Sequence, residues 1–137
     1  MPERNLEHER AAYAYDCIQD IKNNHPDVEG KYRSAVLSAG ALIQKAGLMQ
    51  TLAFYLSKKN HYEELADHIL CWIQCHNHKG QTKLVFKQLL YLNDEAMIEK
   101  NMETMALITW LKRFAEGVLK KEGENSAPVE AMIEEET

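Results

Sequence analysis

The residues best suited to chemistry lie close together in the middle of the chain. Thiolate and imidazole groups are the ligands that zinc prefers, and four of them complete a tetrahedral site. The usual arrangement, a closely spaced cysteine pair followed at a distance by a second pair, is missing here. A zinc-stabilised module is therefore the less favoured interpretation, and we expect neither a structural metal nor a cofactor. The residues concerned are His68, Cys71, Cys75, His76 and His78.

The same segment predicts a covered surface. At about 100° per residue, one stripe of the helix that carries these residues faces away from its apolar side. Exposed free cysteines are reactive, so we expect a neighbouring helix or a partner subunit to cover this stripe. The stripe consists of Glu64, His68, Cys71 and Cys75.

The residue patterns that support covalent or nucleotide chemistry are missing. The serines do not lie beside a plausible histidine base or in a strand-to-helix turn, because Ser34, Ser38 and Ser57 fall within expected helices or at their ends. The glycine-rich sequences that bind nucleotide phosphates are also absent. We therefore expect a protein that is not an enzyme and has no small-molecule substrate.

Positive charge is concentrated in one segment. The formal net charge of −5 equals that of the tail from Gly123, which has five glutamates and no basic residue, so the preceding residues balance. A neutral body with a basic segment can bind a polyanion, although a solvated charged face explains the same residues. Residues 31–60 lack Asp and Glu and contain the basic residues Lys31, Arg33, Lys45, Lys58 and Lys59.

A second basic site, Lys112-Arg113, follows a tryptophan in the last expected helix. These side chains either contact phosphate groups or form salt bridges and cover the core with their aliphatic stems. The second interpretation is favoured when the pair is considered alone.

The elements that position these residues are predicted to be helices. Apolar residues recur at spacings of three and four, and convincing strand alternation is missing. We expect an all-α, single-domain bundle of about six helices around a long C-terminal helix. Residues 1–122 form this helical domain, and residues 123–137 form an acidic, disordered tail. The expected helices span about 6–24, 31–46, 48–58, 62–74, 83–91 and 95–122, with loops at 26–30 and 76–81.

Turn and cap residues set several of these boundaries. Pro26 ends the first helix, Gly47 makes a tight corner between two helices, and Asn93 caps the last one. The last helix is apolar on nearly all sides, so we expect it to be the central helix of the bundle. Its apolar residues are Ile98, Met102 and Met105 on one side and Leu107, Trp110, Leu111, Phe114 and Val118 on the other.

The cellular compartment follows from the cysteines and the hydropathy pattern. Three irregularly spaced cysteines are typical of free thiols in a reducing cytoplasm. No stretch approaches the roughly 20 apolar residues that a membrane span requires. We therefore expect a cytoplasmic protein without a membrane partner.

Five stretches of the chain together form a recognisable pattern, namely 10–14 (RAAYA), 31–34 (KYRS), 42–46 (LIQKA), 47–54 (GLMQTLAF) and 102–116 (METMALITWLKRFAE). Together they resemble the small helical subunit of the type III-B CRISPR effector, the Cmr complex. The resemblance covers roughly residues 8–120, although 59–92 matches only in helical character. The run Gly-Leu-Met-Gln-Thr-Leu-Ala-Phe at 47–54 is fairly specific. One departure is Ala39-Gly40, near a position where many relatives have a proline.

This resemblance implies a non-catalytic subunit of an antiviral ribonucleoprotein. Such a subunit binds beside the backbone subunits on the guide RNA, stacks in more than one copy and helps to hold the target RNA. Its phosphate contacts are independent of sequence and weaken with salt. The alternative is a helical adaptor that binds proteins and has no nucleic-acid role. The resemblance implies RNA contacts for Lys45, Lys58, Lys59, Lys112 and Arg113, then Lys31 and Arg33, and structural roles for Gly47 and Trp110.

Overall fold

The fold was analysed in a computed structural model that describes residues 5–74 and 82–121. Within these ranges every regular element is helical, which confirms the predicted all-α class. The expected loop at 76–81 and the acidic tail at 123–137 lie outside the described residues. The elements are α1 (Leu6–Asn24), a short 3₁₀ helix η1 (Pro26–Val28), α2 (Glu29–Ala46), α3 (Leu48–Lys58), α4 (His61–Ile73), α5 (Thr82–Leu89) and α6 (Asp94–Val118).

The first helix begins and ends where the sequence predicted. The side-chain oxygen of Asn5 accepts a hydrogen bond from the His8 amide at 3.2 Å, which caps the start of α1. His25 and Pro26 end it. The predicted loop at 26–30 is wrong, because Pro26–Val28 forms η1 and α2 already begins at Glu29. Proline has the backbone angle that the first turn of a helix requires, so it ends one helix and starts the next turn.

One residue separates α2 from α3. Gly47 has φ +90° and ψ 159°, a conformation that a side chain makes unfavourable, and this confirms the predicted corner. Upstream of the corner, α2 runs without interruption through Ala39-Gly40. A Cβ atom added at Gly40 would lie at ordinary contact distances of 3.6 and 3.9 Å from Met105 and Ile108, so this part of α2 packs on α6.

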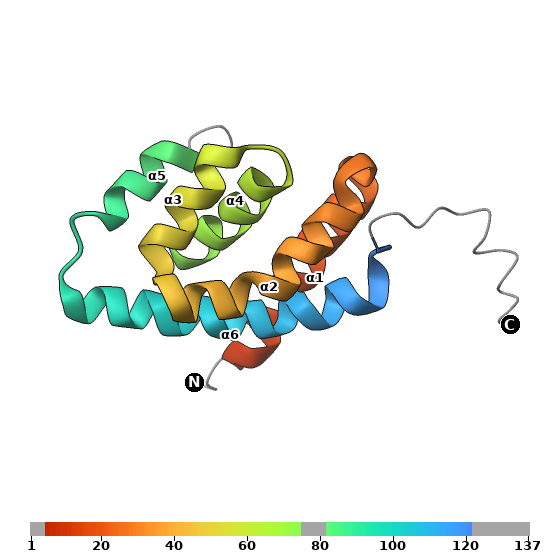
Figure 1. Cartoon of the computed structure of the whole chain (residues 1–137). Helices are drawn as coiled ribbons and strands as arrows, with labels where there is room; N and C mark the ends of the chain where they lie inside the picture. The colour runs from red at the N-terminus through yellow and green to blue at the C-terminus, as the bar shows by residue number, and fades with distance from the viewer. Residues whose placement is uncertain (1–4, 75–81, 122–137) are drawn as a thin grey trace, which may run out of the picture.

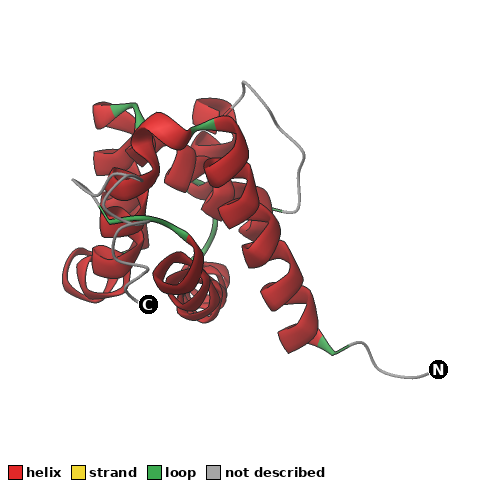
Figure 2. Ribbon diagram, turned by 90° about the vertical axis from the view of Figure 1, so that its right-hand side faces the viewer, coloured by secondary structure: helices red, strands yellow, loops and turns green. Residues whose placement is uncertain are grey.

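Helix α6 is the central element of the bundle. It runs along one side of the molecule in Figure 1, with α2 lying over it and α1 crossing it, and contacts α1, α2 and α4. The direction of α2 is opposite to that of α6, because Glu29 accepts a hydrogen bond from the Lys120 amide while Gly40 lies near Met105. Figure 2 shows the same bundle turned by 90°, with all its elements helical. The predicted bundle around a long C-terminal helix is confirmed, but α6 is packed along one side and not on nearly all sides.

The core confirms most of the predicted apolar faces and corrects two parts of them. Leu107 and Leu111 of α6 are fully buried. Ile98 and Met102 are 59% and 68% exposed, so the prediction that they line a packed side is wrong. Met102 borders an open groove where α1 crosses α6, and among the described residues no helix covers it. Helical spacing also predicts Leu6 and Ala46 on the apolar faces of the first and second helices, and both are exposed.

The remaining boundaries differ from the prediction by a few residues. Helix α4 begins and ends one residue earlier, α5 ends at Leu89 instead of residue 91, and α6 ends at Val118 instead of residue 122. The cap of α6 was correct, since the side chain of Asn93 accepts a hydrogen bond from the Ala96 amide at 2.8 Å.

Candidate functional site

A stripe of exposed residues runs along α2 on the side away from the core. Its members are three and four residues apart, so they lie in one row on the helix. The row carries a lysine at each end and small side chains between them, and the end residues are about 21 Å apart along the helix axis. We call this row the α2 stripe: Lys31, Ser34, Ser38, Ala41 and Lys45.

The N-terminal half of the α2 stripe borders a shallow polar pocket of about 350 Å³. His61 and Tyr62, at the start of α4, form its other wall. Lys58 and Lys59 come just before His61, so the structure brings them to the same end of the molecule as Lys31. The Gly47 corner makes this possible because it turns the chain back beside α2.

The end of α3 has an unusual backbone. Lys59 and Asn60 have φ values of 64° and 63°, which asparagine tolerates better than lysine. The Lys58 ammonium lies 5.6 Å from the centre of the Phe54 ring, within the range of a cation–π contact. Lys59 makes no cation–π contact among the described residues, and the side chains of Lys58 and Lys59 are both exposed.

The other predicted cations occupy different positions. Lys112 and Arg113 are exposed on α6, and neither forms an ion pair within residues 5–74 and 82–121. Arg33 is partly buried, and its Nε atom has no hydrogen-bond partner there. Arg33 shares the side of α2 that bears Gly40 and faces α6, whereas the α2 stripe lies more than 90° around the helix. The seven predicted residues therefore do not form one continuous patch.

The sequence predicted that a neighbouring helix or a partner subunit covers the stripe of Glu64, His68, Cys71 and Cys75 on α4. This prediction is confirmed for His68. Its side chain is buried between α1 and α2, where its Nδ1 atom lies 2.7 Å from the Tyr32 hydroxyl and its Nε2 atom 3.4 Å from Asp20. A carboxylate can only accept a hydrogen bond, so Nε2 donates to Asp20 and, in the neutral ring, Nδ1 accepts from Tyr32. The hydrogen bond from His68 holds the pKa of Asp20 well below its usual range. Cys71 is partly buried, and Cys75, His76 and His78 lie outside the described residues.

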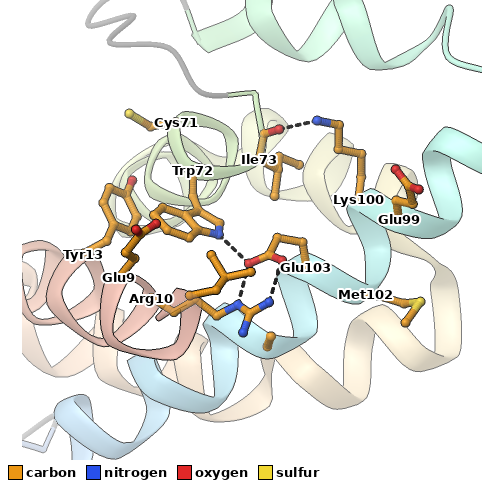
Figure 3. Close-up of a pocket in the computed structure, with 12 residues that line it drawn as sticks. Glu9, Arg10, Tyr13, Cys71, Trp72, Ile73, Glu99, Lys100, Met102 and Glu103 are labelled. Carbon is orange, nitrogen blue, oxygen red and sulfur yellow. Dashed lines mark hydrogen bonds and ion pairs between the residues drawn. The ribbon is translucent and has the colours of Figure 1, made fainter. Parts of the chain in front are cut away.

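A groove between α1, α4 and α6 contains a polar network that the sequence did not reveal (Figure 3). Arg10 donates to both carboxylate oxygens of Glu103, at 2.6 and 2.8 Å, and the Trp72 indole donates to the same group at 2.8 Å. These contacts lower the pKa of Glu103, chiefly through the hydrogen bond from Arg10. Lys100 donates to the Ile73 carbonyl at the end of α4. The network ties three helices together beside a largely apolar groove of about 920 Å³.

Trp110 performs a related structural role further along α6. Its indole nitrogen donates to Glu7 at 2.7 Å, and its ring stacks on Phe114 at a centroid distance of 5.9 Å. It therefore fixes α6 to the first turn of α1. None of the helices within residues 5–74 and 82–121 has both the length and the hydrophobicity that a membrane span requires.

Comparison with known proteins identifies the family. A family model described as CRISPR-associated protein (Cas_Cmr5) matches residues 6–118, which include every helix of the structure. This chain belongs to the Cmr5 family. The resemblance to the small subunit of the Cmr complex is thereby confirmed. Cmr5 proteins are small, generally non-catalytic subunits that associate with the other subunits of the Cmr effector.

A solved structure agrees with this assignment at the level of the fold. The crystal structure of a CRISPR-associated Cmr5 family protein from Thermus thermophilus matches with a TM-score of 0.73 and 23% sequence identity. The match covers 85% of this chain and 100% of the Thermus chain. The arrangement of helices described above is therefore the Cmr5 fold.

Proposed function

We propose that this Cmr5 protein is a non-catalytic subunit that lies along the backbone subunits of the Cmr effector and helps to hold target RNA in antiviral defence. The observation that carries the proposal is the α2 stripe. It presents Lys31 and Lys45 to solvent on a segment without carboxylates, and Lys58 and Lys59 lie beside its N-terminal end. Such a surface attracts a polyanion although the whole chain is acidic.

The chemistry of the stripe suits phosphate contacts that are independent of sequence. Lysine ammonium groups act as point charges toward phosphate and do not read bases. The small side chains between the two lysines allow a nucleic-acid backbone to approach the helix closely. Ser38 uses its hydroxyl proton within α2, where it donates to the Ala35 carbonyl at 3.2 Å, so the lysines supply the main attraction.

Single copies of such a surface bind weakly, because each supplies few phosphate contacts. Copies stacked along one RNA strand act together, since the first contact raises the effective concentration of the others. We therefore include self-association within the complex in the proposal. Guide RNA and target RNA, and not a small molecule, are the non-protein partners.

The test uses the assembled Cmr complex containing a charge-reversed subunit, Lys31→Glu with Lys45→Glu. Target-RNA affinity is measured over a range of salt concentrations. We expect weaker binding at low salt and a shallower salt dependence, by about 0.7 in logarithmic slope for each phosphate that the variant no longer binds. The matched control is Lys83→Glu with Lys87→Glu, which makes the same charge change on exposed residues of α5. Unchanged RNA affinity in the stripe variant would contradict an RNA role.

The groove between α1, α4 and α6 favours a second candidate function, that of a protein adaptor without an RNA role. Its lining is largely apolar, and Met102 and Leu6 at its edge are 68% and 44% exposed. Exposed apolar surface of this kind marks sites of protein association. If both charge-reversed subunits assemble and bind RNA like the wild type, the adaptor function is the better account.

A further inference from the structure

Three side chains that commonly bind metals converge where the end of α1 meets the start of α4. Asp20 lies in the last turns of α1, His25 caps that helix, and Glu64 lies in the first turn of α4. The His25 Nε2 atom is 3.9 Å from Asp20 Oδ2 and 3.6 Å from Glu64 Oε1. One donor atom from each of the three residues lies within 4.8 Å of the other two.

These separations approach those of a metal coordination sphere. Zinc binds imidazole nitrogen and carboxylate oxygen at about 2.0–2.2 Å, so two ligands of a tetrahedral ion are about 3.4 Å apart. The two measured distances from His25 exceed this value by about 0.2 and 0.5 Å. The third separation, between a carboxylate oxygen of Asp20 and one of Glu64, is at most 4.8 Å, so side-chain rotation has to shorten it by up to about 1.4 Å.

The electrostatics of this position favour a cation. Asp20 and Glu64 contribute two negative charges, and within the described residues neither pairs with a lysine or an arginine. The negative end of the α1 dipole and the positive end of the α4 dipole both lie here and oppose each other, so the two carboxylates supply the attraction for a cation. The three side chains are 33–36% exposed, so an ion can reach them from solvent and keep water as a further ligand.

A buried hydrogen-bond chain fixes one of the three ligands. His68, which is 8% exposed, donates from Nε2 to Asp20 Oδ2 and is itself held by the fully buried Tyr32 hydroxyl. The other oxygen of Asp20 accepts from the Asn24 side chain at 2.7 Å. Metal-binding side chains in proteins are typically oriented by such partners, which reduce the entropy lost when the ion binds. An isolated pair of surface carboxylates lacks this support.

We propose that Asp20, His25 and Glu64 bind one divalent transition-metal ion of the zinc class, with water completing the coordination. One imidazole and two carboxylates suit zinc, and they bind it more tightly than manganese or iron in the same geometry. The ion joins α1 to α4, two helices whose metal-binding residues are separated by about 40 positions in sequence. This site is separate from the cysteine segment that the sequence singled out, and it does not depend on the proposed RNA function.

The experiment first removes metal from the full-length, tag-free chain with a chelator. Zinc is then titrated into the protein, and binding is measured by calorimetry. We expect one equivalent to bind. The single variants Asp20→Asn, His25→Ala and Glu64→Gln should each weaken binding by tenfold or more. The matched controls Asp16→Asn, His8→Ala and Glu63→Gln change the same residue types on the same helices and should bind as the wild type does.

A second measurement separates this site from the thiols. Thiolate ligands give bound cobalt a near-ultraviolet charge-transfer band, which nitrogen and oxygen ligands do not produce. We therefore expect cobalt at this site to show ligand-field bands but no charge-transfer band. Circular dichroism checks that each variant is folded. The proposal is wrong if the wild type binds no zinc, if the three variants bind like their controls, or if Cys71→Ser abolishes binding.

Discussion

The isosteric change Glu103→Gln tests whether the network beside the groove stabilises the bundle. It removes the charge from a carboxylate that accepts three hydrogen bonds, two from Arg10 and one from Trp72. The amide that replaces it keeps one acceptor oxygen but turns an NH₂ group toward these donors. The shape of the side chain is unchanged, so no cavity forms.

The size of the effect follows from the hydrogen bonds that the amide cannot accept. A hydrogen bond to a charged group contributes about 1.5–3 kcal/mol. The Arg10 and Glu103 side chains are 14% and 27% exposed, so water weakens the pair and the lower end of this range applies. The amide oxygen can take the Oε2 position and keep the bonds from Arg10 Nε and Trp72, so the change removes the bond at Oε1 and weakens the other two by removing the charge. Together these losses lower the free energy of unfolding by about 2–3 kcal/mol. At about 4 °C per kcal/mol for a chain of this length, Tm falls by roughly 10 °C.

The effect also depends on pH in a defined direction. Because Arg10 lowers the pKa of Glu103 in the folded state below its ordinary value of 4.5, the carboxylate stabilises the fold above that pH. This stabilisation is lost as the pH falls through the folded-state pKa, because protonation then favours the unfolded chain. The difference in stability between wild type and Glu103→Gln therefore narrows below about pH 4.5.

Urea and thermal unfolding at pH 7 and at pH 3.5, followed by circular dichroism, measure both effects. The control Glu99→Gln makes the same change one turn earlier on α6, on an exposed side chain that borders the same groove. Equal stability of the two variants at pH 7, or a difference that is as large at pH 3.5 as at pH 7, would refute the reasoning.

Three further predictions concern the helices themselves. Gly47→Ala should lower the free energy of unfolding in urea by about 1–3 kcal/mol, because a residue with a side chain is strained at this positive φ. Steric contact does not contribute, since no atom lies within 4 Å of the added Cβ. Unchanged stability would contradict the strain. Leu107→Ala should cost about 2–5 kcal/mol because the side chain is fully buried, whereas the exposed Met102→Ala should change stability little, and equal costs would contradict the burial described here. Asn93→Ala should cost about 0.5–2 kcal/mol through loss of the α6 cap, with Asn101→Ala as the control within the same helix.

Local signals in the sequence predicted the helices well, because they act over a few residues. Pro26 and Gly47 determine the local backbone conformation independently of tertiary packing, and Asn93 caps the helix that follows it. The bounds of α1 and α3 were correct for this reason. The exposure of Lys45 was also predictable, since it lies opposite the apolar face of its own helix.

Features that depend on which helices pack against each other could not be predicted from such local signals. Ile98 and Met102 have the spacing of a core face, but periodicity does not show whether another helix covers that face. Arg10 and Glu103 are 93 residues apart, so no sequence window contains both. The cysteines and histidines of one segment stand out in the sequence, whereas the approach of Glu64 to His25 arises only from the way α4 meets α1.

The pairing of α1 with α6 affects how the protein folds during synthesis. The residues of α1 are made before those of α6, yet α6 is the helix that contacts α1 most extensively, and it ends at Val118, 94 residues after Asn24. At about 5–20 residues per second, the ribosome needs roughly 5–20 s to make that interval. During this time the buried face of α1 has no α6 to cover it. We expect the nascent chain to complete its core late, and changes that delay the synthesis of α6 to increase its exposure to chaperones and proteases.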